Sequence, residues 1–370
     1  MTRVGILYGG RSGEHEVSLR SAASVVHRLD PQRFTPIPIG ITTTGAWFAQ
    51  DPNRVRREAA EGEMLSIETP EAARVSVLPS RGLAVDTQLL EVDVVFPVLH
   101  GSFGEDGTVQ GLLELAGIPY VGAGVCGSAV GMDKDLAKRL WRQAGLPTAP
   151  FETLRREHLV DEHDRLTDHR VDAVARRLTH SFSLPWFVKP ARAGSSVGVS
   201  RVGDIAEFVK AVELALRYDT KLVVEPEIHG REIECSVMGT EKIRTFAPGE
   251  VRPHHEFYSY EAKYVDPDGA ALFVPAELPP DIAEEVRSVA GAAYRTVECE
   301  GFARLDFFVD TDNHEIRLNE INTIPGFTSI SMFPKLCEAG GLPYEDLLAE
   351  LIALALRRHR LKNALLYQWS

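Results

Sequence analysis

The sequence contains few cysteines and shows no pattern that would pair them. Four occur among 370 residues, and they stand far apart: Cys126, Cys235, Cys299 and Cys337. This spacing favours four reduced thiols over a disulfide framework. We therefore expect the cysteines to serve as small buried apolar groups.

Long apolar runs are missing as well. No run reaches the roughly 18 residues that a membrane helix needs. The short apolar start ends at Gly9-Gly10, with charges directly after it. Such a start is also too short for the core of a signal peptide. We expect a soluble cytoplasmic protein with no membrane partner.

Positive charge is in deficit. Lysine and arginine number 40 against 53 aspartate and glutamate, which gives a net charge of −13. An acidic surface repels polyanions, so nucleic acid and anionic membranes are not expected partners. Any basic residues around a bound phosphate must be a local exception.

The first 125 or so residues alternate between strand and helix patterns. Residues 3–8 and 92–98 have the apolar pattern of buried strands, and Val17 belongs to a helical apolar face between them. This alternation predicts an α/β unit with a parallel, doubly wound sheet, whose strand C-termini carry ligands. Residues 48–88 are less regular, and we assign them no function.

The rest of the chain predicts two further units. The expected strands are residues 184–189, 221–225, 302–310 and 314–320, and the expected helices are residues 133–144, 204–218, 282–297 and 344–358. The helix at 204–218 begins with Asp204 at its cap and Glu207 three residues later. We expect units at residues 1–127, 128–230 and 231–370.

One glycine motif suggests a different enzyme class. Residues 122–127 fit G-x-G-x-x-G after a short apolar run, as in NAD-dependent dehydrogenases. A dinucleotide site also needs an acidic residue about 20 positions further on. Residues 146–150 read Leu-Pro-Thr-Ala-Pro, and the motif comes late in its unit. A tight turn between domains explains the glycines better.

Two neighbouring strands carry a possible metal site. Residues i and i+2 of a strand share a face, so Arg304 points with Asp306, and Glu320 with Asn322. A hairpin that turns at residues 311–313 would bring both pairs together. Its two carboxylates and one amide oxygen suit two Mg²⁺ (or Mn²⁺) ions that bridge ATP phosphates. The alternative is a solvated polar face, but the Gly/Ser/Thr-rich loop that follows favours the metal site.

Two other segments fit a nucleotide. Lys189 closes a strand and precedes the small-residue loop 190–198, whose backbone amides could approach phosphate oxygens. Glu225 ends another strand before the turn to Glu232, where an adenine and a ribose could be held. The alternatives for these segments are a flexible hairpin turn and a charged surface turn.

Together the segments resemble ATP-grasp enzymes, and closely resemble D-alanine–D-alanine ligases, over nearly the whole chain. Five matches in the right order carry the resemblance. They are residues 9–18 (GGRSGEHEVS), 100–107 (HGSFGEDG), 194–198 (GSSVG), 260–264 (YEAKY) and 319–329 (NEINTIPGFTS). The resemblance implies a three-domain ATP-grasp architecture.

The resemblance implies roles for residues that bind ATP and metal. The residues that match phosphate and other ATP contacts are Lys134, Lys189, Ser196 and Lys263. Those that match adenine and ribose contacts are Glu225, Pro226, Ile228 and Glu232. Asp306, Glu320 and Asn322 match the metal ligands.

It also implies residues for the two D-alanine molecules. Glu14 matches the group that meets the first ammonium, although an acid there would also complement a helix dipole. Ser195 and Tyr264 match residues that bond with Glu14, and His100 matches a residue near the first substrate, although it could also be a structural turn histidine. Ser331 and the backbone of Met332 match the site of the second carboxylate. Arg304 and the Gly326 N–H would stabilise the oxyanion.

The expected reaction joins two D-alanines through an acyl phosphate, for peptidoglycan synthesis. Residues 254–273, with Lys263 and Tyr264, would form a lid over ATP. Ligases that form D-alanyl-D-lactate lack this Lys-Tyr pair, so a dipeptide product is favoured, while D-alanine–D-lactate or D-alanine–D-serine ligation remains the alternative. A non-catalytic amino-acid sensor would not need three metal ligands. Members of the family are commonly homodimers.

Overall fold

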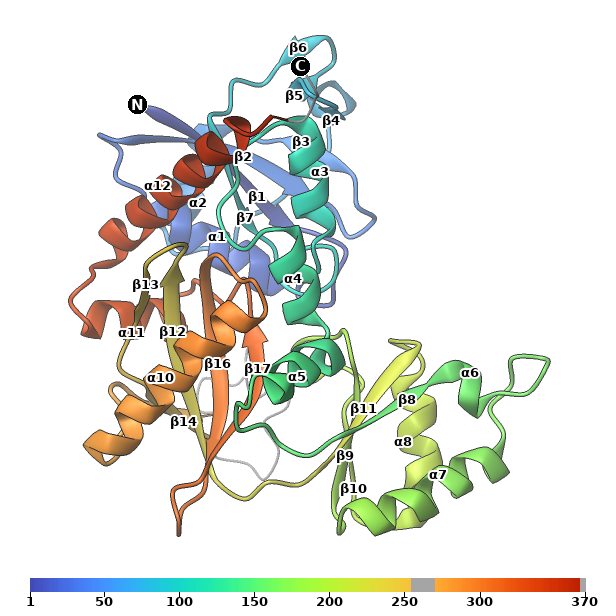
Figure 1. Cartoon of the computed structure of the whole chain (residues 1–370). Coiled ribbons are helices and arrows are strands. Elements are labelled where there is room, and N and C mark those ends of the chain that lie inside the picture. Colours follow the sequence, from blue (N-terminus) through green and yellow to red (C-terminus); the bar gives the residue numbers. More distant parts are fainter. Residues whose placement is uncertain (254–269, 367–370) are drawn as a thin grey trace.

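The computed structural model describes residues 1–253 and 270–366 (Figure 1). Most of the expected lid, with Lys263 and Tyr264, lies outside these residues. Among the helices of the described ranges, none is both long and apolar enough to span a membrane.

The N-terminal sheet is built on β1 (Thr2–Gly9). It lies parallel to β2 (Phe34–Ile41) on one side and to β7 (Val94–Val98) on the other. At the edge, β3 (Trp47–Ala49) runs antiparallel to β2, so the strand order is β3-β2-β1-β7. Helix α1 (His15–Arg28) follows β1 directly. The predicted parallel sheet is therefore confirmed, with one antiparallel edge strand.

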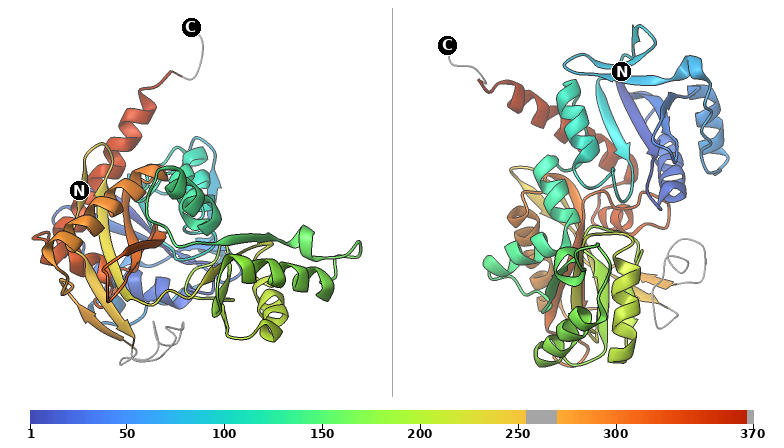
Figure 2. Two further views of the ribbon diagram at one scale, coloured as in Figure 1. Left: turned by 60° about the horizontal axis from the view of Figure 1, so that its bottom comes forward. Right: turned by 90° about the vertical axis from the view of Figure 1, so that its right-hand side faces the viewer.

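Helices cover both faces of this sheet, as Figure 2 shows from the side. Val4 and Ile6 of β1 pack into a core that includes α1 and α12 (Tyr344–Asn363). Leu7 points the other way, into a core that includes α3 (Thr108–Ala116). A strand buried on both faces needs an almost continuous apolar run, and β1 has one. The doubly wound arrangement is confirmed.

The irregular segment 48–88 forms a small appendage to this unit. It contains α2 (Pro52–Ala60), η1 (Glu71–Ala73) and the three-stranded sheet β4 (Val75–Leu78), β5 (Gly82–Val85) and β6 (Gln88–Leu89). Its helix packs against α1, and β4 lies beside β3. The segment therefore packs against the N-terminal unit through α1 and β3.

The central unit is an antiparallel sheet of order β10-β9-β11-β8 that projects from the rest of the molecule (Figure 1). Its elements are β8 (Glu152–Arg155), α6 (Arg156–Leu159), α7 (Asp168–Ser181), β9 (Trp186–Pro190), β10 (Ser200–Val202), η2 (Ile205–Glu207), α8 (Phe208–Ala215) and β11 (Lys221–Pro226). The predicted helix at 204–218 is shorter and starts as a 3₁₀ turn, with the expected capping box between Asp204 and Glu207. Trp186 and Phe208 meet edge to face in its core.

The third sheet has six strands, all paired antiparallel. Its strands are β12 (Arg231–Gly239), β13 (Ile243–Thr245), β14 (Gly249–Pro253), β15 (Ala270–Phe273), β16 (Gly301–Val309) and β17 (Ile316–Asn322). Three further helices pack against one face: α4 (Val125–Met132), α5 (Lys134–Gln143) and α10 (Pro280–Thr296). Helices α11 (Met332–Ala339) and α12 lie on the opposite side (Figures 1 and 2).

One aromatic cluster joins the first and third sheets. The ring of Phe327 lies 5.5 Å from that of Phe96 on β7 and 5.5 Å from that of Phe302 on β16, measured between centroids. Phe333 and Tyr344 complete the cluster from α11 and α12. These two sheets therefore share one continuous core, while the unit boundaries at 127/128 and 230/231 stay a prediction.

The glycine motif forms a tightly packed turn. Gly122 has a φ of +103°, and a Cβ at Gly301 would lie 2.8 Å from the Gly122 carbonyl oxygen. A Cβ at Gly127 would lie 2.6 Å from the carbonyl oxygen of Glu298. These glycines let two backbones approach closely, as a turn between domains requires.

The cysteine expectation was correct for three of four residues. Cys235, Cys299 and Cys337 are buried free thiols. Cys126 is free but exposed, so the expectation of burial was wrong there. It belongs to the first turn of α4, beside the exposed Val125. Four reduced thiols remain consistent with the structure.

Candidate active site

Glu14 and Ser195 bring two units together at the carboxyl end of β1. Glu14 precedes α1 and is buried, and its carboxylate accepts a hydrogen bond from the hydroxyl of Ser195. A Cβ at Gly101 would clash with the Glu14 carboxylate, and one at Gly194 would lie 3.1 Å from it. Glycine at both positions makes room for the carboxylate. The sequence-predicted pair is therefore in contact.

His100 is buried, and both of its ring nitrogens have hydrogen-bond partners. Its Nδ1 donates to the carbonyl of Ile324 at 2.9 Å, and Nε2 bonds the Ser21 hydroxyl at 3.0 Å. Burial by itself would lower the pKa of His100, but the carboxylates of Glu105, whose oxygen lies 3.9 Å from Nδ1, and Glu14 outweigh it and raise that pKa. His100 thus both braces the turn and stands next to the predicted first-substrate site.

The loop between β9 and β10 has an unusual backbone. Ser195 and Ser196 have φ values of +49° and +58°, and Gly198 has +70°. Two adjacent non-glycine residues in the left-handed region cost energy and persist where their surroundings enforce them, often at ligand sites. The loop therefore fits the predicted phosphate-binding segment.

Lys134 connects this loop to β17. Its ammonium donates to the Ala193 carbonyl at 2.8 Å and lies 3.2 Å from a Glu320 carboxylate oxygen. Burial opposes its charge, but Glu320 foremost raises the pKa of Lys134 above its usual value. Lys134, Glu320 and Asn322 line one small cavity with Gly194. Lys134, predicted to contact phosphate, and Glu320 and Asn322, predicted to bind metal, therefore lie around the same cavity although they are far apart in the sequence.

The β16–β17 hairpin forms as predicted, with an irregularity in its pairing between Asp306 and Phe307. Asp306 pairs with Glu320, and Arg304 pairs with Asn322, so the four polar side chains share one face. The Arg304 guanidinium holds both Asp306 oxygens at 2.7 Å, and the Asn322 amide donates to Asp306 at 3.0 Å. Arg304 also lies 3.1 Å from Glu234, a partner that sequence reasoning missed.

This donor set suits hard divalent cations. In the described part of the chain, no three His, Cys, Asp or Glu side chains gather into a metal-binding group. The hairpin instead offers two carboxylates and one amide oxygen, which are ligands that Mg²⁺ accepts. Arg304 and Lys134 already balance these carboxylates, so the local charge is compatible with cations bound to a polyphosphate.

Glu225 lies between the buried Lys138 and the partly exposed Lys189. Its two oxygens are 2.7 Å from the Lys189 ammonium and 2.8 Å from that of Lys138. Burial disfavours the carboxylate, but both lysines hold the pKa of Glu225 down at about 2. Sequence reasoning missed Lys138. Its position, four residues after Lys134 and three before the buried Trp141, places it on the inner face of α5.

The adenine and ribose candidates lie at the connection between β11 of the central sheet and β12 of the third sheet. Pro226 ends β11 opposite Trp186, and Glu232 is the second residue of β12. Ile228 is half-buried in the short turn between the strands. None of the three is among the residues that line the small cavity of Lys134 and Glu320.

The start of α11 carries the residues predicted to hold the carboxylate of the second substrate. Ser331 precedes the helix, and its hydroxyl bonds the Thr328 N–H at 3.0 Å. A Cβ at Gly326 would lie 2.6 Å from that hydroxyl, so only glycine leaves the space open. The first helical N–H groups, beginning at Met332, favour an anion, whereas the Met332 side chain is buried. Gly326, Ser331 and the Met332 backbone are brought together as predicted.

The fold, with Glu14 and Ser195 beside the cavity of Lys134 and Glu320, is that of an ATP-grasp ligase. The models for the D-ala D-ala ligase N-terminus and C-terminus match residues 3–123 and 140–353. The chain belongs to the D-alanine–D-alanine ligase family.

Individual relatives support the assignment over full length. The chain is 48% identical over 370 residues to D-alanine–D-alanine ligase A of Bradyrhizobium diazoefficiens, covering 98% of this chain and 97% of the relative. The Caldicellulosiruptor bescii D-alanine–D-alanine ligase is 44% identical, with 99% and 98% covered.

Solved structures agree. The Coxiella burnetii D-alanine-D-alanine ligase matches with a TM-score of 0.82 and 37% identity, covering 98% of this chain and 96% of that one. The VanG D-Ala:D-Ser ligase of Enterococcus faecalis matches with a TM-score of 0.81 and 33% identity, covering 96% and 99%.

Proposed function

We propose that this chain joins two D-alanine molecules into D-alanyl-D-alanine and converts ATP to ADP and phosphate. The observation that carries the proposal is the contact between Glu14 and Ser195, beside the cavity of Lys134 and Glu320. A group that can hold an amino acid ammonium thus stands next to groups that can hold a polyphosphate. An ATP-driven ligase needs this adjacency.

In the first step, a carboxylate oxygen of the first D-alanine attacks the γ-phosphorus of ATP. The bond to ADP breaks, and an acyl phosphate forms. Glu14, supported by Ser195, Tyr264 and His100, holds the ammonium. The residues that hold ATP are Lys134, Lys189, Ser196 and Lys263 at the phosphates and Glu225, Pro226, Ile228 and Glu232 at the adenine and ribose. Cationic side chains and amides offset the charge of the transferring phosphoryl group.

In the second step, the amine of the second D-alanine attacks the acyl carbon and expels phosphate, and the departing phosphate takes up the proton that the amine loses. Ser331 and the Met332 N–H hold the second carboxylate at the start of α11. Arg304 and the Gly326 N–H stabilise the oxyanion that develops, an interaction of about 3–4 kcal/mol in comparable sites. The acyl phosphate is hydrolysable, so the site has to exclude water during the reaction.

Asp306, Glu320 and Asn322 are the residues that would hold two Mg²⁺ (or Mn²⁺) ions. Such ions neutralise the charge of bound phosphates and orient them. The described structure contributes the placement of these three side chains on one face of the β16–β17 hairpin.

A second candidate product is D-alanyl-D-serine, because the chain is also similar to a D-Ala:D-Ser ligase structure; D-alanyl-D-lactate is the third member of this set. Tyr264 and the Lys-Tyr pair favour the D-alanine dipeptide. The test is ADP release with D-alanine alone, with L-alanine, and with D-alanine plus D-serine or D-lactate, each with and without Mg²⁺. Release with D-alanine alone that requires Mg²⁺ supports the proposal, and no release in any mixture refutes it.

We also propose the setting of the reaction. The dipeptide is a precursor for peptidoglycan, so the enzyme works in the cytoplasm, where ATP is available. The protein forms a homodimer and needs neither nucleic acid nor a membrane as a partner. Light scattering of the purified protein tests the dimer directly.

A further inference from the structure

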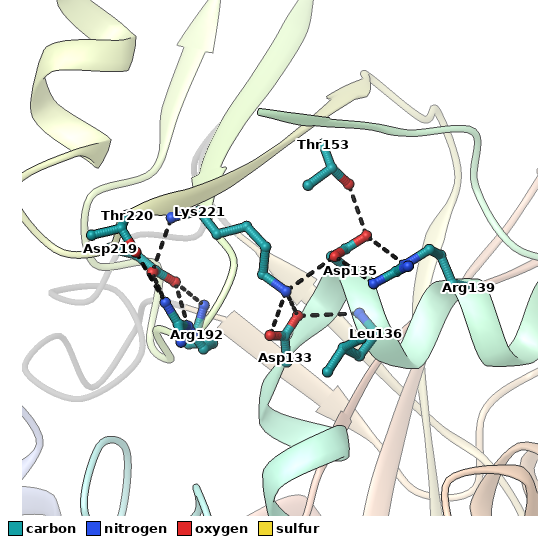
Figure 3. Close-up of polar contacts among 9 residues, drawn as sticks. All are labelled: Asp133, Asp135, Leu136, Arg139, Thr153, Arg192, Asp219, Thr220 and Lys221. Carbon is teal, nitrogen blue, oxygen red and sulfur yellow. Dashed lines mark hydrogen bonds and ion pairs between the residues drawn. The ribbon is translucent and has the colours of Figure 1, made fainter. Parts of the chain in front are cut away.

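A buried ion cluster joins the start of α5 to β11 (Figure 3). The ammonium of Lys221, the first residue of β11, lies 2.6 Å from an Asp133 oxygen and 3.0 Å from an Asp135 oxygen. The side chain of Lys221 is 7% exposed, and those of Asp133 and Asp135 are 7% and 3% exposed. Charges this deeply buried are costly unless their geometry is well satisfied.

The two aspartates flank Lys134 in the sequence. Asp133 caps α5 by accepting from the Leu136 N–H at 3.1 Å. Asp135 also accepts from the Thr153 hydroxyl on β8 at 2.8 Å. The first turn of α5, which carries Lys134, is therefore fastened to two strands of the central sheet through side chains that do not face the cleft cavity.

The same cluster reaches the loop that follows β9. The Lys134 N–H donates to the Ala191 carbonyl at 3.0 Å, and the Ala191 N–H donates to the Lys221 carbonyl at 2.9 Å. Asp219 accepts from the Arg192 N–H at 2.8 Å and from the Lys221 N–H at 3.1 Å. The Arg192 guanidinium also forms an ion pair with Asp219, which Figure 3 shows beside the Lys221 cluster. Lys221 thus lies where α5, β11 and the phosphate loop meet.

We propose that Lys221 is a positioning residue for ATP: it holds Lys134 and the 191–198 loop at the separation that the phosphates require. This inference rests on the proposed function, because it assigns Lys221 to the ATP half of that site. Lys221 does not touch the nucleotide and acts through Asp133 and Asp135. Displacement of phosphate-binding groups by about 1 Å can reduce catalysis a hundredfold.

A purely structural cluster would stabilise the fold without setting the affinity for ATP, and the variants must separate these roles. Lys221→Met alone would remove the cation beside the buried Asp133 and would leave Asp135 with only Arg139, which favours unfolding. The double variant Lys221→Met/Asp135→Asn removes one charge of each sign and keeps Asp133 as the helix cap. Lys221→Arg keeps the charge but changes its geometry. The matched control is Arg54→Met/Glu58→Gln, an ion pair of 2.6 Å between largely buried side chains in α2.

The readouts are KM for ATP, KM for D-alanine, the affinity for ADP with Mg²⁺ by calorimetry, and Tm. For Lys221→Met/Asp135→Asn we expect KM for ATP and Kd for ADP to rise about 10- to 100-fold, with KM for D-alanine close to wild type. Lys221→Arg should move the same two constants in the same direction, and the control should lower Tm only.

Two results would overturn the inference. One is a lower Tm with ATP and ADP constants equal to those of the wild type, because the cluster would then be structural only. The other is an equal rise in the constants for ATP and D-alanine, which would indicate a general loosening. If the wild type binds ADP but never turns over D-alanine, the proposed function fails, and the ADP affinities of the variants still decide the role of Lys221.

Discussion

Glu14 and Ser195 stand 181 positions apart in the chain, yet the hydroxyl of one donates a hydrogen bond to the carboxylate of the other. Glu14 comes from the turn after β1, and Ser195 from the loop after β9. The N-terminal unit and the loop at residues 191–198 therefore meet at this bond, where the proposed first D-alanine would have its ammonium.

Replacing the Glu14 carboxylate should weaken binding of the first D-alanine. A hydrogen bond to a charged group contributes about 1.5–3 kcal/mol, so Glu14→Gln should lower kcat/KM for D-alanine about 10- to 100-fold. KM for ATP should stay nearly constant, because the amide still fills the space. Glu16→Gln, an exposed residue on the same helix, is the control. A normal kcat/KM for D-alanine in Glu14→Gln would remove Glu14 from the substrate site.

Arg304 should matter for turnover more than for binding. The loss of an oxyanion donor costs about 3–4 kcal/mol, so Arg304→Ala should reduce kcat about a hundredfold or more. The control is Arg317→Ala, a half-exposed arginine on β17 that pairs with Glu315. Thermal unfolding of both variants shows whether loss of the Arg304 guanidinium beside Asp306 and Glu234 destabilises the fold. A folded Arg304→Ala enzyme with near-normal kcat would refute the role.

Lys138 should support the fold beneath the ATP site. Its side chain is 1% exposed and pairs with Glu225. Breaking a buried pair costs about 3–5 kcal/mol, so Lys138→Met should lower the free energy of unfolding in urea by that amount. Lys138→Met/Glu225→Gln should recover part of the loss. Lys210→Met, an exposed lysine on α8, serves as the control. A stability loss for Lys138→Met no larger than that control's would show that the pair contributes little.

Glu250 should make the fold sensitive to acid. Burial would raise its pKa, but hydrogen bonds and charges from Arg231 and Arg252 lower it from 4.5 to about 2. The unfolded chain therefore binds the proton more readily, so the stabilisation is complete above about pH 4.5 and is lost as the pH falls towards about 2. Urea unfolding across this range should show a steeper loss for the wild type than for Glu250→Gln.

The control for this prediction is Glu277→Gln. Its carboxylate is 79% exposed and lies 3.8 Å from Arg252, so its replacement should leave the acid dependence close to that of the wild type. Equal acid sensitivity in wild type and Glu250→Gln would assign the loss to other carboxylates.

Much of the fold follows from local patterns in the sequence. The apolar run of β1 and the i, i+2 spacing of Arg304 and Asp306 each depend on neighbours within a few residues. The parallel sheet and the polar face of the hairpin were predictable for that reason. The helix after Asp204 was predicted too long. The spacing of apolar residues does not distinguish a 3₁₀ turn from the first turn of an α-helix, and here a 3₁₀ turn comes first.

The site depends on contacts between distant segments, which spacing does not reveal. The pairing of Glu14 with Ser195 came from the family resemblance alone. Lys138 and Lys221 were missed because a lysine in a helix or strand usually faces solvent, and here each depends on a carboxylate from another element. Cys126 was assigned to the interior on composition, but α4 presents it outward.

The central claim is that this cleft makes a peptide bond between two D-alanines. The most direct measurement is the mass of the product that forms when the purified protein, ATP and Mg²⁺ are given D-alanine together with an equal amount of D-serine and of D-lactate. D-alanyl-D-alanine as the main product, with one ADP for each dipeptide, is the predicted result. A main product of D-alanyl-D-serine or D-alanyl-D-lactate, or ADP without a ligated product, would contradict the claim.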